Sequence, residues 1–171
     1  TQSKGLVKWD EKILTFKPEK SFQSTITLGS VSGNFAFGKI IDEVNKKLSF
    51  LEKVNNLKLD IDTFGPDKFN IKEIWESKNL KKSLWSKSFI DLQNDVTTKD
   101  LRQAIREGFD RIEHLKRFTT NSMGTDQGKI SSINALAIVS KLLRKKISEV
   151  GTTTYRPPYN PVSFSAIAGR S

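Results

Sequence analysis

KDLRQAIREGFDRIEHLKRF, residues 99–118, is the stretch that decides the fold, because its apolar residues recur at the spacing of an α-helix. These residues form one stripe, made up of Leu101, Ile105, Phe109, Ile112 and Leu115. Thr97 or Thr98 before Asp100 is a typical signal for a helix start. We therefore predict one amphipathic helix here, in which Gly108 argues against a tight coiled-coil seam.

A second amphipathic helix follows a connection at 120–129 that is rich in turn-forming residues. Gly151 is placed to cap its carboxyl end. The broad apolar face of this helix consists of Ile130, Ile133, Leu136, Val139, Leu143, Ile147 and Val150. Two such helices predict a hairpin, bundle or coiled coil that drives self-association. The residues expected to mediate it are Leu101, Ile105, Ile112, Leu115, Leu136, Leu143 and Ile147.

The amino-terminal part has strand signals at 6–18 and 21–30, where β-branched and aromatic residues recur or alternate with polar ones. Asn34 then fits the cap of a helix. The apolar positions of that helix are Ile41, Val44, Leu48 and Leu51, with Asn55 at the next heptad position. Two interpretations stay open: a core-facing amphipathic helix, or a coiled-coil seam that contains an asparagine.

A further strand is expected where Leu57, Leu59 and Ile61 alternate with polar residues. Asp60 and Asp62 share one face of it, which fits a solvated face better than a divalent-cation site.

The fold class expected from these elements is α+β and mainly helical. A small N-terminal antiparallel sheet is followed by amphipathic helices and a C-terminal helical hairpin or coiled coil. We place an N-terminal α+β domain at 1–92, a C-terminal helical self-association region at 93–151 and an extended tail at 152–171.

Aromatic residues and lysines are interleaved between residues 68 and 92, which is a pattern that a nucleic-acid groove could use. The aromatic residues are Phe69, Trp75, Trp85 and Phe89. Their spacing also matches the core side of a helix, and burial explains them with fewer assumptions.

The tail after Gly151 reads TTTYRPPYNPVSFSAIAGRS and contains three of the five prolines. Tyr155, Tyr159 and Phe164 would be free to dock on a neighbour from an extended, polyproline-like course. The alternative is a disordered end, although this segment is more apolar than a solvating tail requires.

Composition excludes several classes of site. The chain has no cysteine, so it has neither disulfides nor thiolate chemistry. Its single histidine, His114, lies among charged residues, which fits a solvated position and not a metal or catalytic role. Phosphate-binding loops, zinc-binding helices and nucleophile elbows are missing as motifs, so we expect no enzyme, no catalytic residue, no metal and no cofactor.

The net charge of +10 would attract phosphate backbones, acidic proteins or anionic membranes, without choosing among them. No window approaches the roughly 18 consecutive apolar residues of a membrane span, and no secretion signal appears. We expect a soluble intracellular protein that does not bind membranes.

Short motifs in this order resemble the aphid transmission proteins of caulimoviruses: Lys17-Pro18, Gly33-Asn34, the block SVSGNFAFGKIIDEVNKKL (30–48), Phe64-Gly65 and the run Arg111 to Lys116. The resemblance implies a non-enzymatic protein that self-associates and bridges virions to an insect vector. The implied partners are the chain itself, a coiled-coil virion-associated protein and a vector mouthpart protein. The implied location is the host cytoplasm, in viral inclusions. Vector attachment would fall on Gln2, Lys4 and Gly5.

The tail from Thr152 onward has no counterpart in that family, and it supports a rival interpretation. A helical bundle that runs into such a tail also resembles the coat proteins of rod-shaped plant viruses, which polymerise around RNA. Arg102, Arg106 and Arg111 would then contact RNA phosphates. A cellular RNA-binding or assembly protein is a third alternative. The transmission function is slightly preferred, with helical self-association expected in either case.

Overall fold

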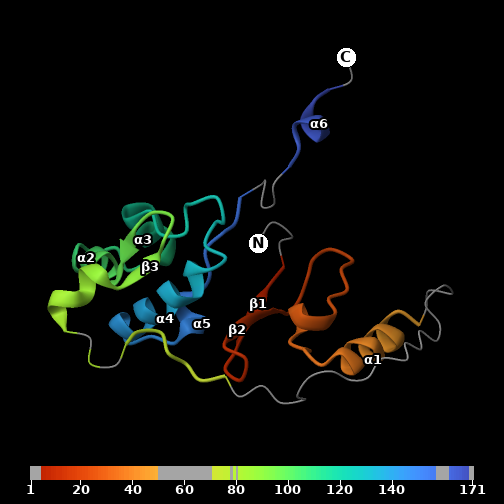
Figure 1. The fold of residues 1–171 in the computed structure, drawn as a ribbon. Helices are drawn as coiled ribbons and strands as arrows, with labels where there is room; N and C mark the ends of the chain where they lie inside the picture. Colours follow the sequence, from red (N-terminus) through yellow and green to blue (C-terminus); the bar gives the residue numbers. More distant parts are fainter. Residues whose placement is uncertain (1–4, 50–70, 78, 80, 157–161, 170–171) are drawn as a thin grey trace. The chain divides into compact units, whose positions relative to one another are not determined.

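The computed structural model describes residues 5–49, 71–77, 79, 81–156 and 162–169 (Figure 1). The chain separates into two compact units. Unit 1 spans Ser3–Glu73 and unit 2 spans Ile74–Ser171. The features expected around Leu51, Asn55, the strand near Leu59, and Asp60 and Asp62 lie outside the described residues.

Unit 1 begins with an antiparallel hairpin of β1 (Val7–Asp10) and β2 (Thr15–Pro18). Trp9 pairs with Phe16 across the hairpin, and their rings meet edge to face with centroids 5.0 Å apart. The Asp10 carboxylate closes the turn, because it accepts the Lys12 N–H at 2.8 Å and forms an ion pair with Lys17.

The segment expected as a second strand at 21–30 is not a strand in the structure. β1 and β2 already pair with each other, and no third strand lies beside them in the described part of unit 1. The segment instead leads into a short 3-10 helix, η1 (Gly29–Ser32).

Helix α1 (Phe37–Lys47) has Ala36 at its N-cap, two residues after the cap expected at Asn34. The Asn34 amide instead donates to Glu43 Oε2 at 2.7 Å. Glu43 also accepts the Gly29 N–H at 3.1 Å and a bond from Lys47 at 2.6 Å. Hydrogen bonds from Lys47, Asn34 and Gly29, in that order of effect, lower the pKa of Glu43 from 4.5 to about 2. This carboxylate therefore ties η1 to α1.

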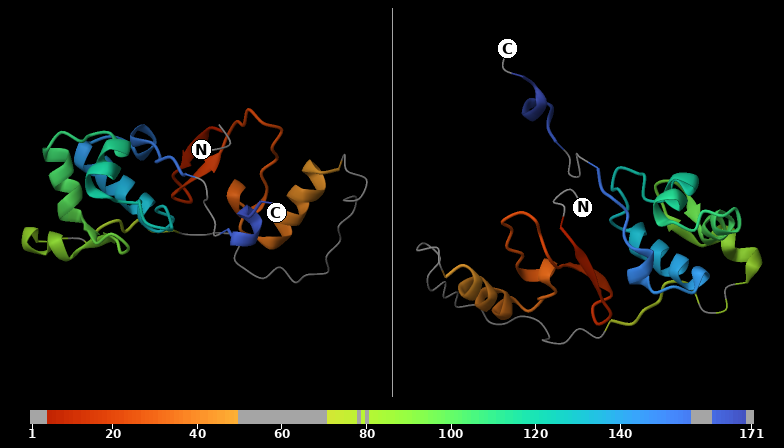
Figure 2. Two further views of the ribbon diagram at one scale, coloured as in Figure 1. Left: turned by 90° about the horizontal axis from the view of Figure 1, so that it is seen from above. Right: turned by 180° about the vertical axis from the view of Figure 1, so that it is seen from behind.

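Unit 2 has a short antiparallel pair and several helices (Figure 2). In chain order, its elements are η3 (Lys82–Lys87), β3 (Phe89–Asp91), β4 (Val96–Thr97), α2 (Thr98–Arg106), α3 (Ile112–Thr119), α4 (Ser131–Leu143), α5 (Ile147–Val150) and α6 (Phe164–Ile167). Residues 74–92 belong to this unit, since η3 contacts α2.

The core of unit 2 lies where α2 and β3 contact α4. Helix α2 also contacts α3, and α5 packs on α4. The buried apolar side chains are Ile90, Val96, Leu101, Ala104, Ile112, Leu115, Ala135, Leu136, Ala137, Ile138 and Val139. Helix α4 supplies the largest share of them, which is why it is apolar around much of its circumference.

The single helix expected over 99–118 is two helices, α2 and α3, separated at Gly108. Gly108 has φ +93°, a left-handed conformation that glycine adopts without a side-chain penalty. The second predicted helix also ends early, because Arg144 has φ 55° and terminates α4. Ile147 and Val150 therefore belong to a separate short helix, α5.

Candidate functional site

The connection between α3 and α4 is the most strained segment described in the chain. We call Thr120–Lys129 the platform loop. Thr120, Ser122 and Gln127 have φ values of 62°, 64° and 49°, and Gly128 has φ 78°. Left-handed backbone is unfavourable for residues other than glycine, so three such residues in one loop must be held by their surroundings. Clustered strain of this kind is typical of functional loops.

Two kinds of constraint fix Gly128. Its positive φ disfavours any side chain. In addition, a Cβ atom at this position would collide with the side chains of Ser122 and Ser132. The platform loop thus packs directly on the first turn of α4.

A buried carboxylate, that of Asp91, bonds the backbone of the platform loop. Asp91, only 2% exposed, lies at the end of β3. Its Oδ2 accepts the Ser122 N–H at 2.7 Å, and its Oδ1 accepts the N–H groups of Gln93 and Asn94 at 2.9 and 3.3 Å. A register irregularity between Phe89 and Asp91 leaves both Ile90 and Asp91 buried, although adjacent strand residues normally face opposite sides.

Three buried hydroxyl groups form what we call the serine cluster: Ser122, Ser131 and Ser132. Ser122 Oγ lies 3.2 Å from Ser131 Oγ and 2.9 Å from Ser132 Oγ, and it accepts a bond from Asn121 Nδ2 at 2.9 Å. Because these hydroxyls are buried and satisfy one another, the cluster is suited to positioning the loop and not to nucleophilic attack. Sequence analysis missed it, since serines at the start of an apolar helix resemble ordinary cap residues.

The tail runs back over this loop as far as Arg156. Gln127 bonds both backbone groups of Arg156: its Oε1 accepts the N–H at 2.7 Å and its Nε2 donates to the carbonyl at 2.8 Å. The Thr154 N–H donates to Glu113 Oε1 on α3 at 2.6 Å, and Lys116 Nζ donates to the Thr154 carbonyl at 3.4 Å. This part of the tail therefore docks on its own unit.

The docked tail affects the pKa of Glu113. Desolvation raises the pKa of Glu113, but hydrogen bonds from Thr154 and Arg117, together with the nearby charges of Lys116 and Arg117, outweigh it. The pKa of Glu113 consequently lies below its ordinary value.

The residues expected to dock the tail on a neighbour differ in how exposed they are. Tyr155 is partly buried, whereas Phe164 is 89% exposed on α6. Tyr159 lies outside the described residues, as do Gln2 and Lys4 of the expected vector-attachment site. Gly5 is partly buried in unit 1.

The residues expected to mediate helical self-association lie mainly inside unit 2. Leu101, Ile112, Leu115 and Leu136 are buried in its core. Ile105, Leu143 and Ile147 are partly buried.

Of the three arginines expected to contact phosphates, Arg102 is held within the protein. Its Nη2 donates to both carboxylate oxygens of Glu76 at 2.9 and 3.0 Å, and its guanidinium lies over the Trp85 ring, 4.2 Å from the centroid. Arg106 and Arg111 are exposed.

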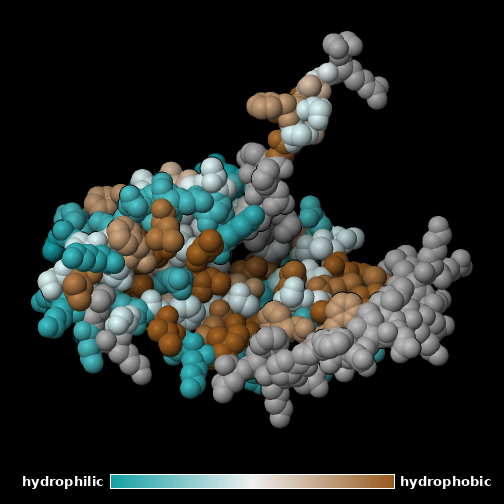
Figure 3. All heavy atoms as spheres, in the orientation of Figure 1, coloured by the Kyte–Doolittle hydropathy of each residue, from teal (hydrophilic) through white to brown (hydrophobic). Residues whose placement is uncertain are grey.

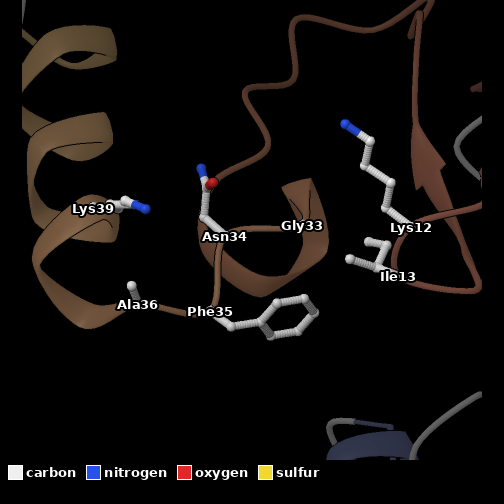
Figure 4. Close-up of a pocket in the computed structure, with 7 residues that line it drawn as sticks. All are labelled: Lys12, Ile13, Gly33, Asn34, Phe35, Ala36 and Lys39. Atoms are coloured by element: carbon white, nitrogen blue, oxygen red, sulfur yellow. The ribbon is translucent and has the colours of Figure 1, made fainter. Parts of the chain in front are cut away.

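Unit 1 contains an open pocket between the hairpin and the start of α1 (Figure 4). Lys12 and Ile13 reach it from the turn after β1, and Lys39 reaches it from α1. The remaining lining residues are Gly33, Asn34, Phe35 and Ala36.

Across the parts of the chain that the structure describes, no group of three or more histidine, aspartate or glutamate residues is arranged to hold a metal ion. The same parts contain no helix that is both long and apolar enough to cross a bilayer.

A family model described as the sarcosine oxidase A3 domain matches residues 85–170, which include both the platform loop and the serine cluster. The sarcosine oxidase subunit alpha of Rhizobium meliloti (strain 1021) is 50% identical over 96 residues, which cover 56% of this chain and 9% of that protein. The subunit alpha of Corynebacterium sp. (strain P-1) is 28% identical over 181 aligned positions, 100% of this chain and 18% of that protein. This chain thus spans less than a fifth of the length of these relatives.

Among solved structures, the crystal structure of L-proline dehydrogenase from P. horikoshii resembles the chain with a TM-score of 0.59. The match covers 98% of this chain and 36% of that one, at 20% sequence identity, so it shows a shared fold alone.

These findings correct the functional interpretation of the sequence. The chain is neither an insect transmission protein nor a rod-shaped virus coat protein, because its relatives are sarcosine oxidase subunits. The expectation of a non-enzymatic protein is contradicted, because the relatives are subunits of an enzyme. The expected partners, namely the chain itself, a coiled-coil virion protein, a vector mouthpart protein and RNA, are wrong, as is the location in host viral inclusions. Motifs of two residues, such as Gly33-Asn34, arise by chance, and an apolar helical stripe is common to most packed helices.

Proposed function

The chain belongs to the sarcosine oxidase A3 domain family, and from that premise we propose that it forms part of the alpha subunit of an oxidase that acts on sarcosine, the N-methyl derivative of glycine. The family match over residues 85–170 carries this proposal. The relatives in Rhizobium and Corynebacterium support it, because all of them are alpha subunits of sarcosine oxidase.

Within that subunit, we assign unit 2 the role of a positioning domain. Asp91 accepts a backbone N–H of the platform loop, and the serine hydroxyls bond one another. None of the buried serines in the described residues is bonded to a base. Unit 2 offers a loop held in place: Asp91 and the serine cluster bond the platform loop, in which Met123 is 53% exposed. A loop that is held by buried bonds and exposes an apolar side chain is suited to a fixed contact with the rest of the oxidase.

The test uses the complete oxidase assembly and measures oxygen consumption with sarcosine as substrate. Asp91→Asn keeps the size of the side chain but replaces one acceptor oxygen with an NH₂ group that faces N–H donors. We expect this change to lower kcat/KM by roughly tenfold to a hundredfold through misplacement of the loop. Asp110→Asn is the matched control, because Asp110 is exposed and the same chemical change there should leave kcat/KM unaltered.

Met123→Ala covers the case in which Asp91→Asn fails to fold, since Met123 is exposed and its loss should not disturb the core. Unchanged kcat/KM in both folded variants would refute the role of the platform loop. An assembly that consumes no oxygen with sarcosine would refute the oxidase function itself.

A further inference from the structure

Helix α1 of unit 1 is amphipathic, yet none of its residues is buried. Phe37, Ile40, Ile41 and Val44 recur at the spacing of one helical face. Ile40 lies close to Gly29 of η1, but Phe37 is still 43% exposed. In a packed domain such a face contacts a core. In the described part of unit 1, Ile40, Ile41 and Val44 are only partly buried and Phe37 is exposed.

The segment before α1 exposes large apolar side chains as well. Phe22 is 72% exposed, Ile26 47% and Val31 57%. We call Phe22, Ile26, Val31 and Phe37 the apolar surface of unit 1. Figure 3 shows hydrophobic side chains at the surface over the segment that joins β2 to α1. Trp9 is the one buried apolar side chain in the described part of unit 1.

Contiguous apolar patches are uncommon on proteins in water, and where one occurs, the surface is usually an interface. The length of the relatives indicates what kind of partner covers this one. The Corynebacterium subunit aligns with the whole chain over only 18% of its own length. The proline dehydrogenase shares the fold of 98% of this chain within 36% of its own chain. In both cases the counterpart of unit 1 lies within a much longer polypeptide.

We propose that the apolar surface of unit 1 docks on an apolar surface elsewhere in a longer oxidoreductase subunit that contains this chain. The proposal rests on the proposed function in taking that subunit to be of the sarcosine oxidase alpha type. The partner surface is apolar at its centre, because it must cover two phenylalanines and two β-branched residues.

The absence of cysteine from the chain allows a direct test, because one introduced cysteine gives one labelling site in the chain. Phe22→Cys and Phe37→Cys report on the apolar surface, and Lys46→Cys is the control on the exposed charged side of α1. Each variant is labelled with a thiol reagent both as the 171-residue chain and within the oxidase assembly purified from cells. The labelled peptides are quantified by mass spectrometry, which separates them from cysteines of other polypeptides.

In the assembly we expect labelling at the two phenylalanine positions to slow at least about tenfold relative to the chain alone, while Lys46→Cys labels at a similar rate in both. Hydrogen exchange over residues 22–37 of the unsubstituted protein makes the same comparison if a variant does not fold. Equal labelling in the two samples would overturn the proposal. Slow labelling of Phe22→Cys and Phe37→Cys in the isolated chain would also overturn the proposal. If the isolated chain then has the mass of a monomer, another part of this chain covers the surface. If it has twice that mass, a second copy covers it.

Oxygen consumption with sarcosine, measured on the same preparations, separates this proposal from the proposed function. Protection at Phe22 and Phe37 without sarcosine-dependent activity would uphold docking and refute the oxidase function. Sarcosine-dependent activity without protection at Phe22 and Phe37 would uphold the oxidase function and refute docking.

Discussion

Gly128 concentrates two restraints in a single residue, a left-handed backbone and a side-chain space already filled by Ser122 and Ser132. We expect Gly128→Ala to lower the free energy of unfolding by about 1–3 kcal/mol. Urea denaturation of the chain measures this loss in the transition that unfolds unit 2. Gly169→Ala is the control, because that glycine has ordinary φ and open space around it. Equal midpoints for the two variants would contradict the geometry described for the loop.

Arg102 combines an ion pair to Glu76 with a flat contact on the Trp85 ring. Lysine cannot reproduce both bonds to Glu76 or the flat contact with Trp85, so Arg102→Lys should cost about 1–2 kcal/mol of unfolding free energy. Arg106→Lys, on the exposed side of the same helix, should change the thermal midpoint very little. If both substitutions shift the midpoint alike, the Glu76 contact does not stabilise unit 2.

At the scale of elements, Glu43 makes the junction of η1 and α1 sensitive to acid. Its pKa is about 2 in the folded chain, below the ordinary 4.5. A carboxyl group whose pKa is depressed by folding stabilises the folded state above its unfolded pKa, and this stabilisation is lost as pH falls through the folded pKa. The contribution should therefore be complete above pH 4.5 and disappear as pH approaches about 2.

The Gly29 amide proton reports this titration by NMR, because it donates to Glu43. We expect Glu43→Gln to abolish the pH-dependent shift between pH 4.5 and about 2. Asp42→Asn, an exposed neighbour on α1, serves as the control and should preserve it. A Gly29 shift that persists in Glu43→Gln would mean that another group controls the junction.

The periodicity of apolar residues predicted where helices lie more accurately than where they begin and end. The stripe from Leu101 to Leu115 marked residues that do become buried in α2 and α3, since apolar spacing reflects packing directly. The break at Gly108 depends on one backbone angle, which competes with a continuous apolar pattern and leaves no mark in it. The segment 21–30 shows the opposite failure: alternation supplies a strand pattern, but a strand forms only where a neighbour is available to pair.

The candidate site was less accessible to sequence reasoning than the helices were. Turn-forming residues marked 120–129 as a connection, but Asp91 meets Ser122 across 31 positions, and only the folded chain brings them together. Asp91 also occupies a strand position whose burial depends on a register irregularity. Such contacts have no local periodicity from which they could be predicted.

On the scale of the whole molecule, the two units differ in how much apolar surface they bury. Unit 2 has a core formed by α2, α4 and β3, whereas Trp9 is the one buried apolar residue in the described part of unit 1. We therefore expect the isolated chain to unfold in two steps, with α1 opening first. Hydrogen exchange in increasing urea would show amides of α1 losing protection before those of α4. A single transition shared by both helices would contradict this independence.

The two bonds between Gln127 and Arg156 attach the tail of unit 2 to the platform loop. They join positions 29 residues apart, in a chain with no cysteine to cross-link them. A single hydrogen bond would let the backbone at Arg156 pivot, but an amide that both donates and accepts fixes its direction as well as its distance. The path by which the polypeptide leaves α5 is therefore set by the conformation of a loop that precedes α4, and a displacement of one must break both bonds or redirect the other.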